Sequence, residues 1–379
     1  MNKLFINLLA FIVAVILSYV LFFFSKTSIE KNIMLSSFME ESITKSEELK
    51  IDLESGKIVI FGSSELTHND QKFIPQNYFN KELHLPLRVQ GHAGAQCFVI
   101  MSQLAALNNK DLRRDARVVI FLSPGWFSKY SEGTSVPLFL EYMYSGMMYR
   151  LFFESDIEDK YKKLVGDYIF SHHTDFKNLT YLYKYGMQYS LDIATVNPLN
   201  KLINKSLKKQ LTIKSTNYSL VQYKMPFLNY TKLKEEAKKV SKPSTTNNWG
   251  INDDYYTKYV LPKIQKDKFP YDIETPSSLS KNQEYQDFLN LVELLKAYKI
   301  KPLFIMQDLH PYVYVENRDS MNPILSSIKE VLEENEYGYL DMWSYTKEEY
   351  EMGTLTDIMH TGELGWVKIN QKIIEHFMR

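Results

Sequence analysis

The longest apolar run of the chain lies at its start. Residues 4–24 contain only three polar positions, Asn7, Ser18 and Tyr19. At about 1.5 Å of rise per residue, a helix of this length crosses the hydrocarbon core of a bilayer. Small residues that would mark a cleavage site are missing from its end, so the pattern favours a permanent anchor over a signal peptide. We predict a transmembrane anchor over residues 1–26.

The segment after the predicted anchor is polar and helical in pattern. We predict a juxtamembrane stalk over residues 27–49, followed by one domain over residues 50–379. Charge leaves the orientation of the anchor open. Lys3 and the α-amino group flank one end and Lys26 and Lys31 the other, which is nearly a tie under the positive-inside rule.

Within the domain, short β-rich runs alternate with helical patterns. The predicted strands are residues 58–61, 87–89, 117–122, 303–306 and 339–341, and the predicted helices are 95–107, 283–298, 323–334 and 363–377. The run 117–122 shows no polar alternation, as expected for a parallel strand covered on both faces. This order predicts a doubly wound α/β fold, in which ligands bind beyond the carboxyl ends of the strands.

A long stretch between the third and fourth predicted strands lacks strong strand signals. Residues of about 138–260 are rich in Tyr, Leu and Lys, and we predict a helical insertion there. From Lys201 to Lys242, eleven lysines accompany only Glu235 and Glu236, which gives a local net charge of +9. These lysines are either solvated helix faces or a rim that attracts a phosphate polymer.

The composition excludes several classes of protein. The 45 basic and 45 acidic residues give a formal net charge of zero, which argues against a nucleic-acid-binding protein. Cys97 is the single cysteine, so an internal disulfide and a cysteine-based zinc site are excluded, and its apolar surroundings indicate a core residue. His172-His173 has no carboxylate at metal-ligand spacing. We predict no metal site and no cofactor.

A serine near the start and an aspartate–histidine pair near the end have the arrangement of a catalytic triad. The strand 58–61 runs into Gly62-Ser-Ser-Glu-Leu66, and Asp357-Ile-Met-His360 precedes the last predicted helix. A strand that ends in Gly-x-Ser predicts a sharp turn into a helix, whose free N–H groups can meet an oxyanion. Asp357 can orient His360, which deprotonates the serine. The pattern indicates acyl transfer or ester hydrolysis.

Two serines and several other polar residues compete for roles in this site. The elbow position favours Ser64 over Ser63 as the nucleophile. His68 lies near Ser64 in sequence, but only Asp70 is close to it, so a surface histidine is the better interpretation. Gln96 follows the Gly91-His-Ala-Gly94 turn and either binds substrate or simply begins a helix. His92 within that turn and His310 after the fourth strand are further candidates to line the pocket.

These motifs resemble the SGNH hydrolase superfamily and, within it, the membrane-anchored D-alanyl transfer proteins of teichoic-acid D-alanylation. The matching blocks are Gly62-Ser-Ser-Glu-Leu66, Ser123-Pro-Gly-Trp-Phe127, Asn248-Trp-Gly-Ile-Asn-Asp-Asp-Tyr255, Tyr285-Gln-Asp-Phe288, Asp341-Met342, Asp357-Ile-Met-His360 and Gly365-Trp366. They extend over nearly the whole chain. The resemblance implies a three-layer, flavodoxin-like α/β fold with a central parallel sheet.

The resemblance also implies roles for single residues. Ser64 would be the nucleophile, His360 the base and Asp357 the orienting carboxylate. Gly94 falls where the superfamily supplies an oxyanion-hole N–H, and Ser63 stands where many members carry aspartate.

The third block of the chain departs from the superfamily pattern. Where an asparagine usually supplies a third oxyanion donor, this chain has Ser123-Pro-Gly-Trp126. The indole N–H of Trp126 either replaces that donor or packs the cleft.

The resemblance implies a reaction outside the cell, which orients the anchor. A D-alanyl group, delivered by a D-alanine carrier route with the help of a membrane O-acyltransferase, would pass through the serine to hydroxyls of lipoteichoic acid. Two alternatives stay open. An esterase or thioesterase of the same fold would use water in place of the polymer hydroxyl, and a non-catalytic scaffold would position the acylation machinery in the membrane.

Overall fold

The structure is a computed structural model, and the part of the chain that it describes has several gaps. The described residues are 7–21, 37–91, 93–108, 116–131, 133–176, 183, 186, 187, 189, 190, 219–224, 226, 228–241, 244–266 and 268–378. The chain divides into two compact units. One comprises Met1–Glu48, Ala105–Asn108 and Tyr142–Thr216, and the other comprises Leu49–Leu104, Asn109–Glu141 and Asn217–Arg379.

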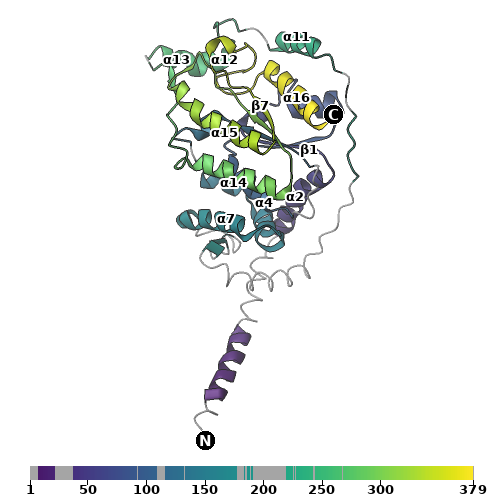
Figure 1. Cartoon of the computed structure of the whole chain (residues 1–379), viewed down its shortest axis with the longest axis vertical. Coiled ribbons are helices and arrows are strands. Elements are labelled where there is room, and N and C mark those ends of the chain that lie inside the picture. Colours follow the sequence, from purple (N-terminus) through teal and green to yellow (C-terminus); the bar gives the residue numbers. More distant parts are fainter. Residues whose placement is uncertain are drawn as a thin grey trace. The chain divides into compact units, whose positions relative to one another are not determined.

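Five strands of the second unit form one parallel sheet (Figure 1). They are β1 (Ile58–Gly62), β2 (Leu87–Gly91), β3 (Arg117–Leu122), β5 (Leu303–Met306) and β7 (Gly338–Asp341), in the spatial order β2-β1-β3-β5-β7. Every pairing between neighbours is parallel. The three central strands are buried nearly throughout, as their unbroken apolar runs predict. The predicted α/β class and the predicted parallel sheet are confirmed.

The helices of the chain include all four that the pattern predicts. These are α4 (Cys97–Ala105), α14 (Gln283–Tyr298), α15 (Asn322–Glu334) and α16 (Glu363–Phe377). Further α-helices are α2 (Ser37–Glu54), α3 (Pro75–Asn77), α5 (Val136–Tyr142), α6 (Ser145–Tyr149), α7 (Asp159–Ser171), α8 (His173–Phe176), α11 (Tyr230–Val240), α12 (Asp253–Tyr255) and α13 (Leu261–Ile264). Cys97 is buried, as predicted for a core residue.

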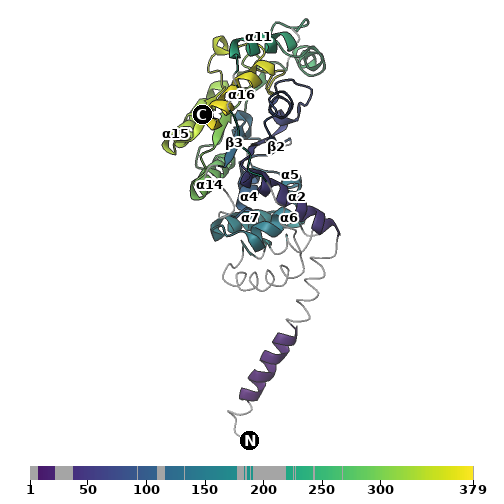
Figure 2. The ribbon, with the colours of Figure 1, turned by 90° about the vertical axis from the view of Figure 1, so that its right-hand side faces the viewer.

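Helices α14 and α16 cover opposite faces of the sheet. Along β5, Leu303 and Ile305 pack into a buried cluster with α16, whereas Phe304 between them contacts Phe288 of α14. Successive side chains of a strand point to opposite faces, so the two helices lie on different sides. Figure 1 shows the strands between α16 and the pair α14 and α15, and Figures 1 and 2 both show α11 beside α16.

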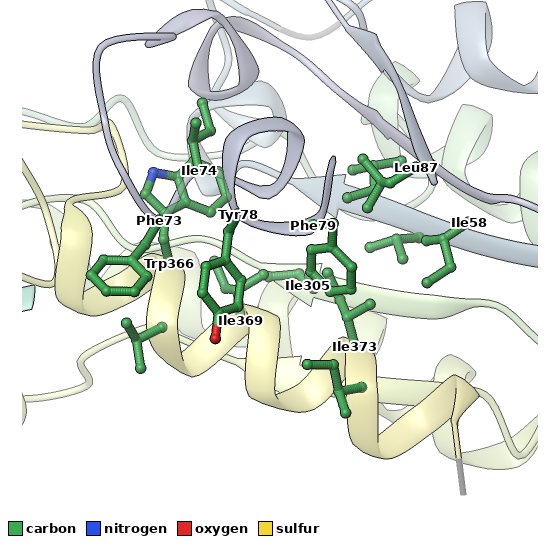
Figure 3. Close-up of a cluster of buried hydrophobic side chains, with 14 of the residues drawn as sticks. Ile58, Phe73, Ile74, Tyr78, Phe79, Leu87, Ile305, Trp366, Ile369 and Ile373 are labelled. Atoms are coloured by element: carbon green, nitrogen blue, oxygen red, sulfur yellow. The ribbon is translucent and has the colours of Figure 1, made fainter. Parts of the chain in front are cut away.

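The cluster beneath α16 ties the C-terminal helix to the segment that follows the first strand. Trp366 is fully buried and lies near Phe73 and Ile74 (Figure 3). Its indole N–H donates to the side-chain oxygen of Gln71, whose own amide donates to the carbonyl of Thr361 at 3.0 Å. Burial of a side chain of this size contributes a few kcal/mol, about 1.5–3 for a large apolar group. These contacts fix the start of α16, and with it the loop that precedes it.

The structure also contains a two-stranded sheet that was not predicted from the sequence. It pairs β4 (Tyr271–Asp272) with β6 (Tyr314–Glu316) in parallel. The backbone N–H of Ile273 extends the pairing by donating to the carbonyl of Glu316 at 3.2 Å.

A buried arginine links two segments of the first unit. Arg150 donates from Nε to the hydroxyl of Ser46 at 2.6 Å, and its guanidinium pairs with Glu47 and Glu154. The predicted insertion of about 138–260 contributes residues to both units. Its bounds, like those of the predicted anchor and stalk, stay predictions.

The predicted membrane anchor is described only in part. Residues 7–21 form a helix whose apolar side chains are exposed. Among the residues that the structure describes, no helix is both long enough and apolar enough to cross a bilayer. The remaining residues of the predicted anchor and the first part of the stalk, 1–6 and 22–36, lie outside the described residues.

Candidate active site

Ser64 stands at the carboxyl edge of the sheet, two residues after β1, and begins the short helix that follows. Residues Ser64–Thr67 form one 3₁₀ turn that ends at His68. The hydroxyl of Thr67 donates to the carbonyl of Ser64 at 2.7 Å and so takes the acceptor that a continuing helix would use. The predicted sharp turn into a helix is present, and the helix is one 3₁₀ turn long.

His360 lies within hydrogen-bond reach of both Ser64 and Asp357. The Oγ of Ser64 is 2.9 Å from Nε2 of His360, and Nδ1 of His360 is 2.7 Å from Oδ2 of Asp357. An ionised carboxylate only accepts, so Nδ1–H donates to Asp357 and Nε2 is left to accept from the serine hydroxyl. This is the tautomer that a general base for Ser64 needs.

The carboxylate of Asp357 is fixed by its own loop. Its Oδ1 accepts from the backbone N–H groups of Met359 and His360, both at 2.8 Å. The loop is closed by the N–H of Thr356, which donates to the carbonyl of His360 at 2.8 Å. Both carboxylate oxygens are therefore occupied, and the histidine ring is held from its backbone and from Nδ1.

The electrostatics of the pair match the geometry. Burial alone would lower the pKa of His360, but the hydrogen bond and the charge of Asp357, with the charge of Glu65, together raise that pKa above its ordinary value. Burial likewise acts to raise the pKa of Asp357, yet the contacts with His360 and the two backbone N–H groups lower it overall. Asp357 thus stays ionised and favours the protonated imidazole that forms when the serine loses its proton.

The side chain of Ser63 is hydrogen-bonded to the backbone of Gly94. The N–H of Gly94 donates to Oγ of Ser63 at 2.7 Å. Gly94 has φ +84, and a Cβ at this position would lie 2.3 Å from Cδ1 of Leu138, so only glycine fits the turn. The Ser63 hydroxyl is buried and engaged by Gly94, whereas Ser64 contacts the histidine. The predicted oxyanion role of Gly94 stays a prediction, because its N–H here contacts Ser63.

Gln96 and Trp126 differ in their relation to the pocket. The Gln96 side chain is buried and donates to the carbonyl of Ser131 at 2.6 Å, and Gln96 is not among the residues that line the pocket beside Ser64. Its side-chain amide holds the loop at Ser131, and the predicted contact of Gln96 with substrate stays a prediction. Trp126, in the turn Pro124–Phe127 after β3, lines the pocket with Ser64 and His360.

Two buried polar residues of the site were not among the predicted site residues. Glu65 accepts the backbone N–H of Ser63 at 2.5 Å, and its burial raises its pKa despite the nearby His360. Gln307, the residue after β5, approaches Glu65 closely enough to lower that pKa, but its Nε2 makes no hydrogen bond of good geometry with the described residues. Gln307 also lines the pocket. In the sequence, the position of Gln307 directly after a predicted strand is the signal that could have marked it as a site residue.

The pocket beside Ser64 has a volume of about 400 Å³. The carboxyl ends of β1, β3 and β5, the Asp357–His360 loop and the segment after β4 contribute to its wall. Its lining includes Asp272 and Glu274 but, among the described residues, no lysine or arginine. It is therefore an open, partly polar pocket with an acidic character.

The other candidate histidines take no part in the triad. The ring of His68 packs against that of His360, with centroids 4.6 Å apart, and burial lowers its pKa. Donor atoms of His68, Asp357 and His360 lie within 4.8 Å of one another, but those of Asp357 and His360 already serve the hydrogen bonds above. His310 is buried, which lowers its pKa to about 4, and it contacts the carbonyl of Trp249. His92 lies outside the described residues.

Comparison with known proteins gives one consistent result. The family model described as DltD protein matches residues 31–378. The chain is 25% identical over 329 residues to Protein DltD of Bacillus subtilis (strain 168), which covers 84% of this chain and 81% of the relative. It is 22% identical over 326 residues to Protein DltD of Staphylococcus aureus (strain NCTC 8325 / PS 47), with 84% and 80% covered.

Proposed function

The chain belongs to the DltD family and so to teichoic acid D-alanylation, and from this premise we propose that it is an acyltransferase that carries D-alanine on Ser64. The observation that carries the proposal is the continuous chain of contacts from Ser64 through His360 to Asp357. The strand order supports an SGNH-type, three-layer architecture, because numbered within the sheet it is the flavodoxin-like order 2-1-3-4-5.

The proposed reaction has two acyl-transfer steps. In the first, Nε2 of His360 takes the proton of Ser64, and Oγ attacks the D-alanyl carbonyl carbon of the donor. The bond to the donor breaks, and His360 returns the proton to the leaving group, which leaves a D-alanyl ester on Ser64. In the second, His360 deprotonates a hydroxyl of lipoteichoic acid, which attacks that ester. The bond to Oγ breaks, and His360 returns the proton to Oγ of Ser64. Asp357 stabilises the imidazolium in both steps.

The tetrahedral intermediate needs donors for its oxyanion. The backbone N–H groups of Ser64 and Gly94 are the candidates at the elbow, with Gly94 exchanging its contact to Ser63 for the ligand. For the third donor, the pocket offers the indole of Trp126 and the side-chain amide of Gln307, which also approaches Glu65. Gln307 is the better candidate on burial, since its Nε2 makes no hydrogen bond of good geometry with the described residues and a ligand oxygen would supply one.

The alternative reaction is hydrolysis of the same acyl-serine. Purified full-length protein, supplied with a D-alanyl thioester donor and lipoteichoic acid, should place more D-alanine on the polymer than it releases to water. The measurement is the ratio of polymer-bound to free D-alanine, with Ser64→Ala as the blank. Release of free D-alanine at an equal rate with and without polymer would favour the esterase or thioesterase. A scaffold without catalytic activity would give neither product above the blank.

The location and the partners follow from the same proposal. The predicted anchor over residues 1–26 would hold the domain at the outer face of the membrane, where lipoteichoic acid is the acceptor. A membrane O-acyltransferase and the D-alanine carrier route would supply the donor. Protease treatment of intact cells tests the topology, because an outward-facing domain is cleaved while a cytoplasmic marker is spared. Protection of both would contradict it.

The lysine-rich stretch from Lys201 to Lys242 is proposed to guide the polymer, although much of it lies outside the described residues. Exposed lysines attract a polyanion over a range that salt limits to about 8 Å at physiological ionic strength. Replacing Lys205, Lys208 and Lys209 with Gln should weaken polymer binding and flatten its salt dependence. Hydrolysis of a small neutral ester should stay near the parent rate, since the triad is untouched.

A matched variant replaces three lysines outside this stretch with Gln, namely Lys299, Lys301 and Lys329. It has the same net charge as the first variant and should bind polymer nearly as the parent does. Equal polymer binding by both variants across a salt series would show that the stretch is an ordinary solvated surface.

A further inference from the structure

The pocket beside Ser64 contains a carboxylate oxygen that has no hydrogen-bond partner among the described residues. Glu274 follows β4 and lines the pocket, and its Oε2 is buried and accepts no hydrogen bond from the described residues. The neighbouring Asp272, by contrast, accepts from the side-chain amide of Asn317 at 2.8 Å. A buried carboxylate oxygen without a donor is costly, and a donor supplied by a ligand removes that cost.

The rest of the lining points to a ligand of positive charge. Three residues with carboxyl groups line the pocket, Glu65, Asp272 and Glu274, and His360 is its only other ionisable residue besides tyrosines among the described lining. An anionic acyl group would meet carboxylates with no lysine or arginine to offset them. A cationic group would offset the negative charge of these carboxylates.

We propose that Glu274 binds the ammonium group of the D-alanyl moiety and so selects a cationic acyl group for transfer. This inference rests on the proposed function, since it assumes that Ser64 carries the acyl group. In an alanyl ester the ammonium nitrogen lies two bonds from the carbonyl carbon. When that carbon is bound to Oγ of Ser64, the ammonium lies close to Ser64, in the pocket that Glu274 also lines. Its N–H groups are then donors for a charge-assisted hydrogen bond to the Glu274 carboxylate.

Glu274 is well placed to act as a fixed acceptor. The residue before it, Ile273, is buried and is held to β6 by its backbone N–H. The segment that carries Glu274 is thereby tied to the small sheet, so the carboxylate is presented from an ordered backbone. Glu274 contacts substrate in this proposal without taking part in the proton transfers, which belong to His360.

The test compares two esters that differ only in the charged group. The probes are the 4-methylumbelliferyl esters of D-alanine and of isobutyric acid, in which a methyl group replaces the ammonium. For full-length Glu274→Gln, kcat/KM for the D-alanyl ester should fall about tenfold or more, the scale of one charge-assisted hydrogen bond. The isobutyryl rate should stay within about twofold of the parent, which also reports that the variant is folded.

A matched control is Glu316→Gln, which removes an exposed glutamate from β6 outside the pocket lining. It should leave the ratio of the two rates unchanged. An unchanged ratio in Glu274→Gln, or an equal fall in both rates, would overturn the ammonium assignment while the acyl-serine proposal stands. Ser64→Ala distinguishes failure of the ammonium assignment from failure of the acyl-serine proposal. Survival of both rates in that variant would overturn the acyl-serine proposal itself.

Discussion

Ser64→Ala should abolish ester-linked D-alanine on lipoteichoic acid while the protein still accumulates. Ser64 is the serine whose Oγ reaches Nε2 of His360, at 2.9 Å, and loss of a nucleophile that acts in a triad costs several orders of magnitude in rate. The Ser64 side chain is only partly buried, so its removal leaves no large cavity and folding is little affected. The measurement is ester-linked D-alanine in cells that carry the variant in place of the parent protein.

Ser63→Ala is the matched control for this prediction. It deletes a hydroxyl of the same size one residue away and removes the acceptor for the Gly94 N–H. A lost hydrogen bond of this kind costs about 1 kcal/mol, so we expect reduced but readily detectable ester. Normal ester content in Ser64→Ala together with its loss in Ser63→Ala would reverse the assignment of the nucleophile.

Asp357→Asn should lower the turnover by about 10³–10⁴-fold and leave the fold nearly unchanged. The amide oxygen of asparagine can still accept from the N–H groups of Met359 and His360, which hold the loop. The position facing Nδ1 of His360 would no longer be an anion. The imidazole then loses the partner that fixes its tautomer and stabilises its charged form. Circular dichroism and the rate with a small ester measure the two effects separately.

The pH profile gives the same residue pair a second test. The base must be neutral, so kcat/KM rises with pH through the pKa of His360 in the free protein. Because Asp357 raises that pKa, the rising limb of the parent should have its midpoint above the ordinary histidine value of about 6.5. In Asp357→Asn only burial and the remaining charges act, and burial lowers the pKa, so the midpoint should move to lower pH. An unchanged midpoint and rate would remove Asp357 from the mechanism.

The core elements could be read from the sequence because their signals are local. The buried strands β1, β3 and β5 are unbroken apolar runs, and the bounds of α14 and α16 agree with the predicted 283–298 and 363–377. For α14 the reason is visible at its start, where the side chain of Asn282 accepts from the N–H of Tyr285 at 3.0 Å. Such caps act within a few residues and leave a trace in the sequence.

The features that were missed depend on contacts between distant residues. The strands β4 and β6 are two and three residues long, too short for any periodicity to show. The helix predicted after Ser64 is present as one 3₁₀ turn, a length that the local pattern does not give. Gln96 faces Ser131, and only the folded chain places that carbonyl within reach.

The site itself was predictable in part, because some of its residues lie in local sequence motifs. Ser64, Asp357 and His360 stand in short motifs of recognisable spacing, and the fold brings them together. Glu65 stood inside the quoted elbow motif, yet nothing local indicates that its carboxyl folds back onto Ser63. Gln307 and Glu274 have no motif, and they become candidates only when burial and missing partners are known.

The most direct test of the account is to locate the acyl group on the protein during turnover. Full-length protein would be mixed with an isotopically labelled D-alanyl thioester, quenched in acid within the first turnover, digested and analysed by mass spectrometry. We predict one labelled peptide, with the label on Ser64, sensitive to hydroxylamine and absent from Ser64→Ala. Label on another residue, or D-alanine reaching lipoteichoic acid with no labelled serine at any time point, would contradict the acyl-serine mechanism.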